Sequence, residues 1–185
     1  MTGGLSELEA CVLGLIWSEG PCTPYHVHRI VRSSPSPHWS GSAGAIYPLI
    51  RRLEERGLIR ANTVRQGSRA GRLCRISPAG RKALHTWLGP PLPDWIAALP
   101  IDPLRTRLRF LGALPAARRL QFVREARDAV RKNLATIRAD CRRLAKGDDP
   151  FEHAMARGAL HVSRARLQWV NEVARMLADS SPAST

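Results

Sequence analysis

Arginine side chains are the residues of this sequence best suited to a chemical role. Arginine outnumbers lysine 26 to 3. Arg51 and Arg52 lie in a segment with helical periodicity, and Arg69 and Arg72 lie in and beside a glycine-flanked turn. A guanidinium group binds phosphate or the O6/N7 edge of guanine through two parallel hydrogen bonds. This pattern predicts contact with a polyanion, and double-stranded DNA is the expected partner.

The positive charge is concentrated in the middle of the N-terminal half. Residues 51–82 contain ten basic and two acidic residues, a net charge of +8, within a chain of formal net charge +14. Residues 1–50 have a net charge of −1. The chain has no run of 18 apolar residues, and Glu7 and Glu9 stand where a signal peptide would carry basic residues. We therefore expect a cytoplasmic protein with a phosphate-facing surface and no membrane partner.

No motif in the sequence indicates catalysis or a cofactor. The cysteines are too far apart for a zinc cage or a disulfide framework, so we expect small buried residues in a reduced compartment. They are Cys11, Cys22, Cys74 and Cys141. His26 and His28 point apart on a helix, which argues against a metal site. With no nucleophile elbow, phosphate-binding glycine loop or paired carboxylates, an enzyme is not expected and neither is a metal or cofactor.

The elements that position the arginines have clear start signals. Ser6 and Glu9 form a capping box, and Thr23-Pro24 and Ser77-Pro78 each combine an N-cap with proline at the first helical position. The expected elements are a helix from Ser6 to Gly20-Pro21, a helix from Thr23, a helix from Ser42 to Arg56, strands Leu58–Arg65 and Arg72–Ile76, and a helix from Ser77 to Leu88. Pro48 requires its helix to begin near 43–45 or to kink there. This order is that of a winged helix-turn-helix domain.

The second half of the chain has the pattern of long paired helices. A proline-rich linker over 89–103 separates the N-terminal domain, 1–88, from a helical domain, 104–178, and 179–185 is expected to be a disordered tail. A helix from Pro115 to Leu144 carries an apolar heptad seam that Arg127 interrupts, and a last helix repeats the seam. The predicted fold is mainly α with a β-hairpin wing, followed by a coiled-coil-like dimerisation domain.

The sequence resembles the PadR family of transcriptional regulators. The residues that carry the resemblance are Ser42, Gly44, Ile46-Tyr47-Pro48, Arg52-Leu53-Glu54, Gly57-Leu58, the wing stretch 67–72, Arg75–Gly80, and, more loosely, 102–104, 109–111 and 166–169. The resemblance implies a dimeric repressor released by a small aromatic or drug-like ligand. Two departures are Leu73-Cys74, where the family shows an aromatic pair, and Ala45, where a hydroxyl residue is usual.

The candidate DNA contacts follow from residue type and position. They are Ser40, Ser42, Tyr47, Arg51, Arg52, Arg69 and Arg72. Hydroxyls at a helix N-terminus bind phosphate, as can the Tyr47 hydroxyl, and one of the adjacent Arg51 and Arg52 can read a base while the other reaches a phosphate. The alternatives are a simple N-cap for Ser42, a core contact for Tyr47, a solvated helix face for Arg51 and Arg52, and a solvated turn for Arg69 and Arg72.

The C-terminal half supplies the expected homodimer contacts and a candidate effector pocket. The dimerisation residues are Leu120, Val130, Leu134, Ile137, Val162 and Trp169. The final helix can cover part of the long helix through Val162, Ala165 and Trp169, and a second subunit would cover the remainder. Trp95 and Trp169 could line an effector cavity or could fill a core.

Two functions fit these features. The first is a sequence-specific repressor that binds a palindromic operator and is released by a ligand. The second is a winged-helix module for protein interaction or constitutive DNA architecture, without an effector. Both share the fold, so only the DNA sequence preference and the ligand response separate them.

Overall fold

The chain forms two compact units in the computed structural model. The structure describes residues 4–34, 39, 43–66 and 69–179, and the side chains of 64–70 lie outside the description. One unit comprises Met1–Ala98 and the other Leu99–Thr185. The division falls inside the segment 89–103 that the sequence marks as a linker, and this segment contains a short 3-10 helix, η2 (Asp94–Ala97).

Three helices of the N-terminal unit begin at the caps that the sequence predicts. In α1 (Glu7–Ser18), the Ser6 N–H donates to Glu9 Oε2 at 2.9 Å and the Glu9 N–H donates to Ser6 Oγ, which confirms the capping box. Thr23 caps α2 (Pro24–Arg32), and Ser77 caps α5 (Pro78–Leu88) by accepting from the Gly80 N–H at 3.0 Å. Local sequence therefore fixes where these helices start.

The third predicted helix is shorter than the sequence pattern suggests. A 3-10 turn, η1 (Ala43–Ala45), precedes α4 (Ile46–Glu55). Pro48 thus lies in the first turn of α4, where its missing N–H leaves no hydrogen bond unmade. Gly57 follows α4 with φ of +69°, the left-handed conformation that suits a glycine after a helix.

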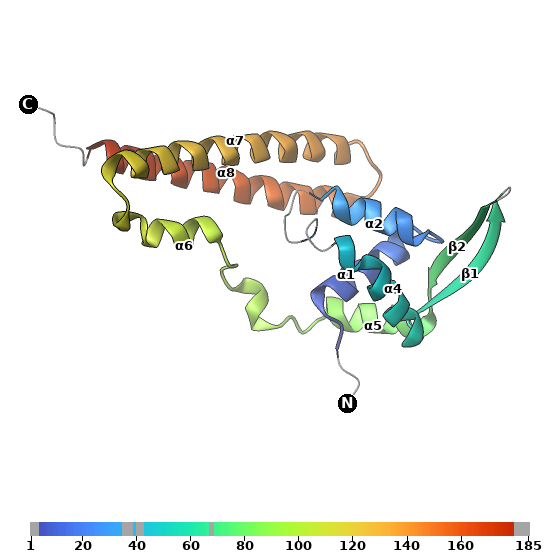
Figure 1. The fold of residues 1–185 in the computed structure, drawn as a ribbon. Helices are drawn as coiled ribbons and strands as arrows, with labels where there is room; N and C mark the ends of the chain where they lie inside the picture. The colour runs from blue at the N-terminus through green and yellow to red at the C-terminus, as the bar shows by residue number, and fades with distance from the viewer. Residues whose placement is uncertain (1–3, 35–38, 40–42, 67–68, 180–185) are drawn as a thin grey trace, which may run out of the picture. The chain divides into compact units, whose positions relative to one another are not determined.

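The wing is a two-stranded antiparallel hairpin. Strand β1 (Ile59–Gln66) pairs with β2 (Arg69–Ile76), from Ile59 opposite Ile76 to Gln66 opposite Arg69. Both strands extend further toward the tip than predicted, because backbone pairing continues through the polar, glycine-containing segment. Figure 1 shows the hairpin projecting beyond the helices of this unit.

The base of the wing is tied to the connection between α1 and α2. The Cys22 N–H donates to the Cys74 carbonyl at 3.2 Å, and the Cys74 N–H donates back to the Cys22 carbonyl at 2.8 Å. Both thiols are free and buried. Burial raises the pKa of Cys22 to about 11, with neighbouring Cys74 and Glu19 adding to the shift. The small Cys74 side chain thus lies in the core at the base of the wing.

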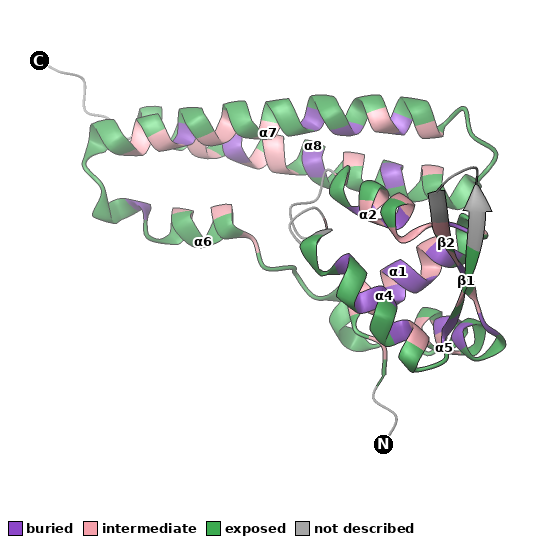
Figure 2. Cartoon of the chain, turned by 45° about the vertical axis from the view of Figure 1, so that its right-hand side comes forward, coloured by how far each residue is buried: buried purple, intermediate pink, exposed green. Residues whose placement is uncertain are grey.

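The core of the N-terminal unit lies between the helices and the base of the wing. Figure 2 marks buried positions on α1, α2, α4 and α5. The largest fully buried side chains of this unit are Leu13, Ile16, Ile46, Leu49, Leu53, Ile59, Val12, Val27 and Cys74. Helix α5 packs so closely on the chain before β1 that a Cβ added at Gly80 would lie 1.9 Å from the Leu58 carbonyl oxygen. This packing fixes the wing relative to α4.

The C-terminal unit is built on a hairpin of two long helices, α7 (Ala116–Leu144) and α8 (Pro150–Asp179), which run side by side (Figure 1). A shorter helix, α6 (Pro103–Arg109), and a 3-10 turn, η3 (Leu111–Ala113), precede them. Asp102 caps α6 and also pairs with Arg166 of α8 at 2.5 Å. No helix in the described part of the chain is long and apolar enough to cross a membrane.

The face that α8 buries differs from the predicted seam. The positions of α8 that are buried are Ala156, Ser163 and Val170, seven residues apart. Val162 is 70% exposed, so the expectation that it covers α7 is wrong. Small side chains on the buried face leave room for Leu134 and Ile137 of α7, which are buried within the chain itself. Adjacent residues differ by about 100° around a helix, so Phe151, Met155 and Val162 of the predicted stripe are exposed, whereas Trp169 and Val173 of the same stripe pack in the core.

Candidate nucleic-acid interface

Helix α4 presents a basic face to solvent while its opposite face is buried. Its buried residues are Ile46, Leu49, Ile50 and Leu53. Arg51 and Arg52 are exposed, and neither side chain forms a hydrogen bond or an ion pair with the described residues. Their guanidinium groups thus keep all of their donors available for phosphate or base edges. The same exposure also fits the alternative prediction, in which this face of α4 contacts only solvent.

Tyr47 lies on the exposed part of α4 next to a histidine of α2. Its side chain is half-exposed, and its ring centroid lies 5.8 Å from that of His28 with the planes tilted by 36°. The contact holds the Tyr47 ring at the surface instead of in the core, so the predicted alternative of a core contact is not what the structure shows. The sequence pattern of two histidines at i and i+2 did not indicate this role for His28.

The wing carries Arg72 back toward the C-terminal end of α4. Arg72 on β2 donates through Nη2 to Glu54 Oε2 of α4, and its side chain remains 52% exposed. A guanidinium group has five donors, so this ion pair leaves others free for phosphate. Sequence reasoning placed Arg72 at the tip of the hairpin and missed the ion pair, because residues 18 apart meet only through the fold.

The other predicted contacts are described in part or not at all. Arg69 begins β2 and its backbone pairs with Gln66 at the described end of the hairpin, which places it nearest the tip, while its side chain is outside the description. Ser40 and Ser42 also lie outside the described residues. Ala45 is the N-cap residue of α4 and forms no side-chain capping bond. These serines therefore stay predictions.

Two hydrogen-bond networks, one at Ser77 and one at Arg56, hold α4 and the wing in place. The Ser77 N–H donates to the Leu58 carbonyl at 3.0 Å, and Ser77 Oγ donates to the Gly57 carbonyl at 2.7 Å. In the second network, Arg56 at the end of α4 donates to Glu9 Oε1 of α1 at 3.1 Å. Burial raises the pKa of Glu9, but hydrogen bonds from Ser6 and the charge and hydrogen bond of Arg56 outweigh it, so the net pKa is lowered.

The predicted dimerisation residues fall into two groups. Leu134 and Ile137 are buried inside one chain, and Leu120, Val130 and Trp169 are partly buried there. Val162 is exposed on α8. It belongs to an exposed apolar stripe with Phe151, 80% exposed, and Met155, 69% exposed. This stripe of α8 is therefore one of the apolar surfaces that the chain leaves uncovered in the described part of the C-terminal unit, where Ile101, Phe110 and Met176 are exposed as well.

The two tryptophans proposed for an effector pocket belong to different units. Trp95 is exposed in η2 of the N-terminal unit. Trp169 packs in the C-terminal core and also lines a hollow of about 290 Å³. The other residues of that hollow are Leu108, Leu111, Gly112, Arg119, Val173, Met176 and Leu177. The described residues contain no group of three or more His, Cys, Asp or Glu side chains that could hold a metal ion.

The comparisons with known families match almost the whole chain. Residues 12–86 match the transcriptional regulator PadR-like family, and residues 102–178 match the virulence activator alpha C-terminal family. The N-terminal domain is therefore similar to PadR-like transcriptional regulators, although each of the two family models covers less than half of the chain. A comparison with curated proteins found no match.

Solved structures share the same fold over nearly their full length. Bacillus subtilis PadR in complex with operator DNA has a TM-score of 0.77 at 20% identity, covering 93% of this chain and 99% of that chain. Bacillus subtilis PadR in complex with p-coumaric acid has a TM-score of 0.69 at 14% identity, and the match covers 95% of this chain and 99% of that chain. The Vibrio cholerae virulence activator AphA has a TM-score of 0.70 at 22% identity, covering 95% and 100%.

Proposed function

We propose that the protein binds a specific operator, with α4 in the major groove and the wing on the DNA backbone. The observation that carries the proposal is the exposed face of α4, where Arg51 and Arg52 have no partner among the described residues. Arg72 on the adjacent wing adds a partly free guanidinium group. The fold is shared with a PadR that was solved with operator DNA, which supports this docking.

The operator is read by a homodimer. The exposed stripe of Phe151, Met155 and Val162 on α8 supports this assembly, because a lone chain leaves these large apolar side chains in water. A second copy covers them through a two-fold interface. The expected operator is therefore a pair of inverted half-sites about one helical turn apart.

The regulator responds to a small aromatic or drug-like ligand that releases it from the operator. The support for this step is the shared fold with a PadR solved with p-coumaric acid, together with hollows in the C-terminal unit. By linkage, a ligand that favours the free protein must bind the DNA complex less tightly.

The regulator could either repress or activate its target genes. Repression is the first candidate, because a dimer bound over a promoter blocks transcription until the ligand removes it. Activation is the second, and the match of residues 102–178 to the virulence activator alpha C-terminal family favours it. A reporter gene behind the operator separates them, because deleting the regulator raises transcription in the first case and lowers it in the second.

Selection of bound fragments from genomic DNA with the purified protein tests the proposal as a whole. The expected result is an enriched inverted repeat that random DNA competes poorly. A flat sequence preference, with no compound altering affinity, would favour a constitutive DNA-architectural or protein-interaction module.

A further inference from the structure

Two arginines stand directly opposite each other on the wing. Arg60 of β1 is the register partner of Arg75 of β2, and both side chains are exposed. Directly opposite residues of an antiparallel pair have Cβ atoms about 4.5–5.5 Å apart, and like charges at this spacing destabilise the pair. The two guanidinium groups therefore repel each other in the free protein.

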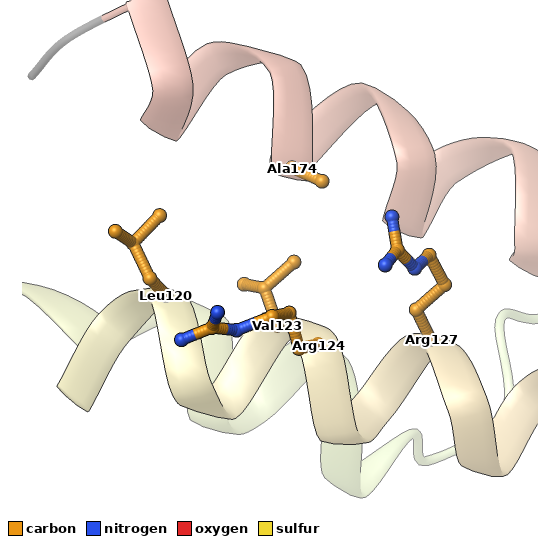
Figure 3. A pocket seen from close by; sticks show the side chains of 5 residues that line it. All are labelled: Leu120, Val123, Arg124, Arg127 and Ala174. Carbon is orange, nitrogen blue, oxygen red and sulfur yellow. The ribbon is translucent and has the colours of Figure 1, made fainter. Parts of the chain in front are cut away.

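Neither arginine has a carboxylate partner in the described part of the chain. Residues 56–93 contain eight arginine or lysine residues and no aspartate or glutamate. The side chains of Arg60 and Arg75 form no ion pair and no hydrogen bond with the described residues. Arg127 of the C-terminal unit also lacks an ion pair there, but its side chain extends from α7 toward α8 beside a hollow (Figure 3). The two wing arginines are exposed to solvent instead, where they are accessible to a large anion.

The hairpin has two faces, and Arg60 and Arg75 lie on the face that is turned away from α4. Side chains alternate between the two faces of a strand. On β2, Arg72 pairs with Glu54 of α4 and Cys74 is buried in the core, so the neighbouring Arg75 belongs to the opposite face. Its register partner Arg60 shares that face. We call the face that carries Arg60 and Arg75 the outer face of the wing.

The start of α5 adds two positive charges close to the wing. Strand β2 ends at Ile76 and α5 begins at Pro78, and Figure 1 shows this helix at the base of the hairpin. Arg81 and Lys82 of α5 are exposed, and their side chains form no ion pair with the described residues. The positive charge therefore continues from the wing onto the next helix.

We propose that the outer face of the wing binds the phosphate backbone of DNA that flanks the half-site. This inference rests on the proposed function, in which α4 enters the major groove and the wing lies on the backbone beside it. Since α4 lies on one side of the wing, the other side faces the base pairs beyond the half-site. Phosphates there complement the charge of Arg60 and Arg75, and a guanidinium fork matches two phosphate oxygens. Flanking DNA thus relieves the repulsion and is bound without regard to its sequence.

Fluorescence anisotropy of the full-length protein with two duplexes tests the inference. One duplex contains only the selected operator, and the other adds about ten base pairs of random sequence, about one helical turn, at each end. The wild type should bind the extended duplex at least about 5-fold more tightly at low salt, with a salt slope steeper by about 0.9 for each added phosphate contact. The double variant Arg60→Gln with Arg75→Gln should lose this advantage of the extended duplex.

Arg138→Gln with Arg142→Gln is the matched control, because it removes two exposed charges from α7 and should keep the full advantage of the extended duplex. The melting temperature without DNA is an independent readout: Arg75→Gln alone should raise it, because the like-charge pair is gone.

Four results would overturn the inference: no advantage of the extended duplex for the wild type, an advantage that persists in the wing variant, an equal loss in the control, or a lower melting temperature of Arg75→Gln. Failure of the proposed function looks different. In that case the wild type would bind the short operator no better than random DNA of the same length, whatever the flanking DNA adds.

Discussion

Ser77 connects the end of α4 to the wing, and its replacement by alanine should destabilise the N-terminal unit. The side chain is 4% exposed. Its Oγ donates to the Gly57 carbonyl at 2.7 Å and accepts from the Gly80 N–H at 3.0 Å. Loss of an N-cap costs about 1 kcal/mol. Leaving the partly buried Gly57 carbonyl without this donor adds about 1–2 kcal/mol. The expected loss for Ser77→Ala is therefore about 2–3 kcal/mol.

Differential scanning calorimetry of the full-length protein measures this loss. For a unit of this size, each kcal/mol lowers the melting temperature by roughly 4–8 °C. The transition of the N-terminal unit should therefore fall by roughly 10–20 °C. Thr86→Ala is the matched control, because Thr86 is an exposed residue of the same helix whose hydroxyl bonds only the Lys82 carbonyl. If Ser77→Ala lowers this melting temperature no more than Thr86→Ala does, the hydrogen bonds of Ser77 do not hold the wing.

Three further predictions concern the wing, the buried thiols and the dimer. Arg72→Ala should weaken binding to all DNA sequences alike and lower the slope of log K against log salt by about 0.9, and an unchanged slope would place Arg72 off the DNA. Because the pKa of Cys22 is about 11, its thiolate at pH 8 is scarce, and iodoacetamide should modify it at least about 100-fold more slowly in the native protein than in guanidinium chloride. Equal rates would show an accessible thiol. Val162→Asp should yield folded monomers by light scattering, whereas Ile137→Asp should unfold the C-terminal unit; a dimeric Val162→Asp protein would exclude the exposed stripe as the interface.

Most helix starts and the order of elements could be predicted because their signals are local. Ser6 and Glu9 lie three residues apart, so the sequence alone shows that each can bond the other's N–H. Pro48 likewise required a helix start near 43–45, and α4 begins at Ile46. Leu134 and Ile137 were correctly assigned to an apolar seam, although the partner that buries them is the same chain.

The remaining features depend on contacts between distant residues. The Arg72–Glu54 ion pair and the Cys22–Cys74 bridge join elements that no spacing rule connects. The first half of the buried face of α8 was mispredicted because large apolar residues such as Phe151 and Val162 suggested the seam, while the smaller Ala156 and Ser163 are the residues that are buried there. Close approach of two helices selects small side chains, and hydrophobicity alone does not reveal them.

We expect α4 to read operator bases through Arg51 or Arg52. The test is fluorescence anisotropy of Arg51→Ala and Arg52→Ala on the selected operator and on random DNA at one salt concentration. One of the two variants should lose about 1–3 kcal/mol on the operator and far less on random DNA. Equal losses on both DNAs for both variants would contradict base reading by α4.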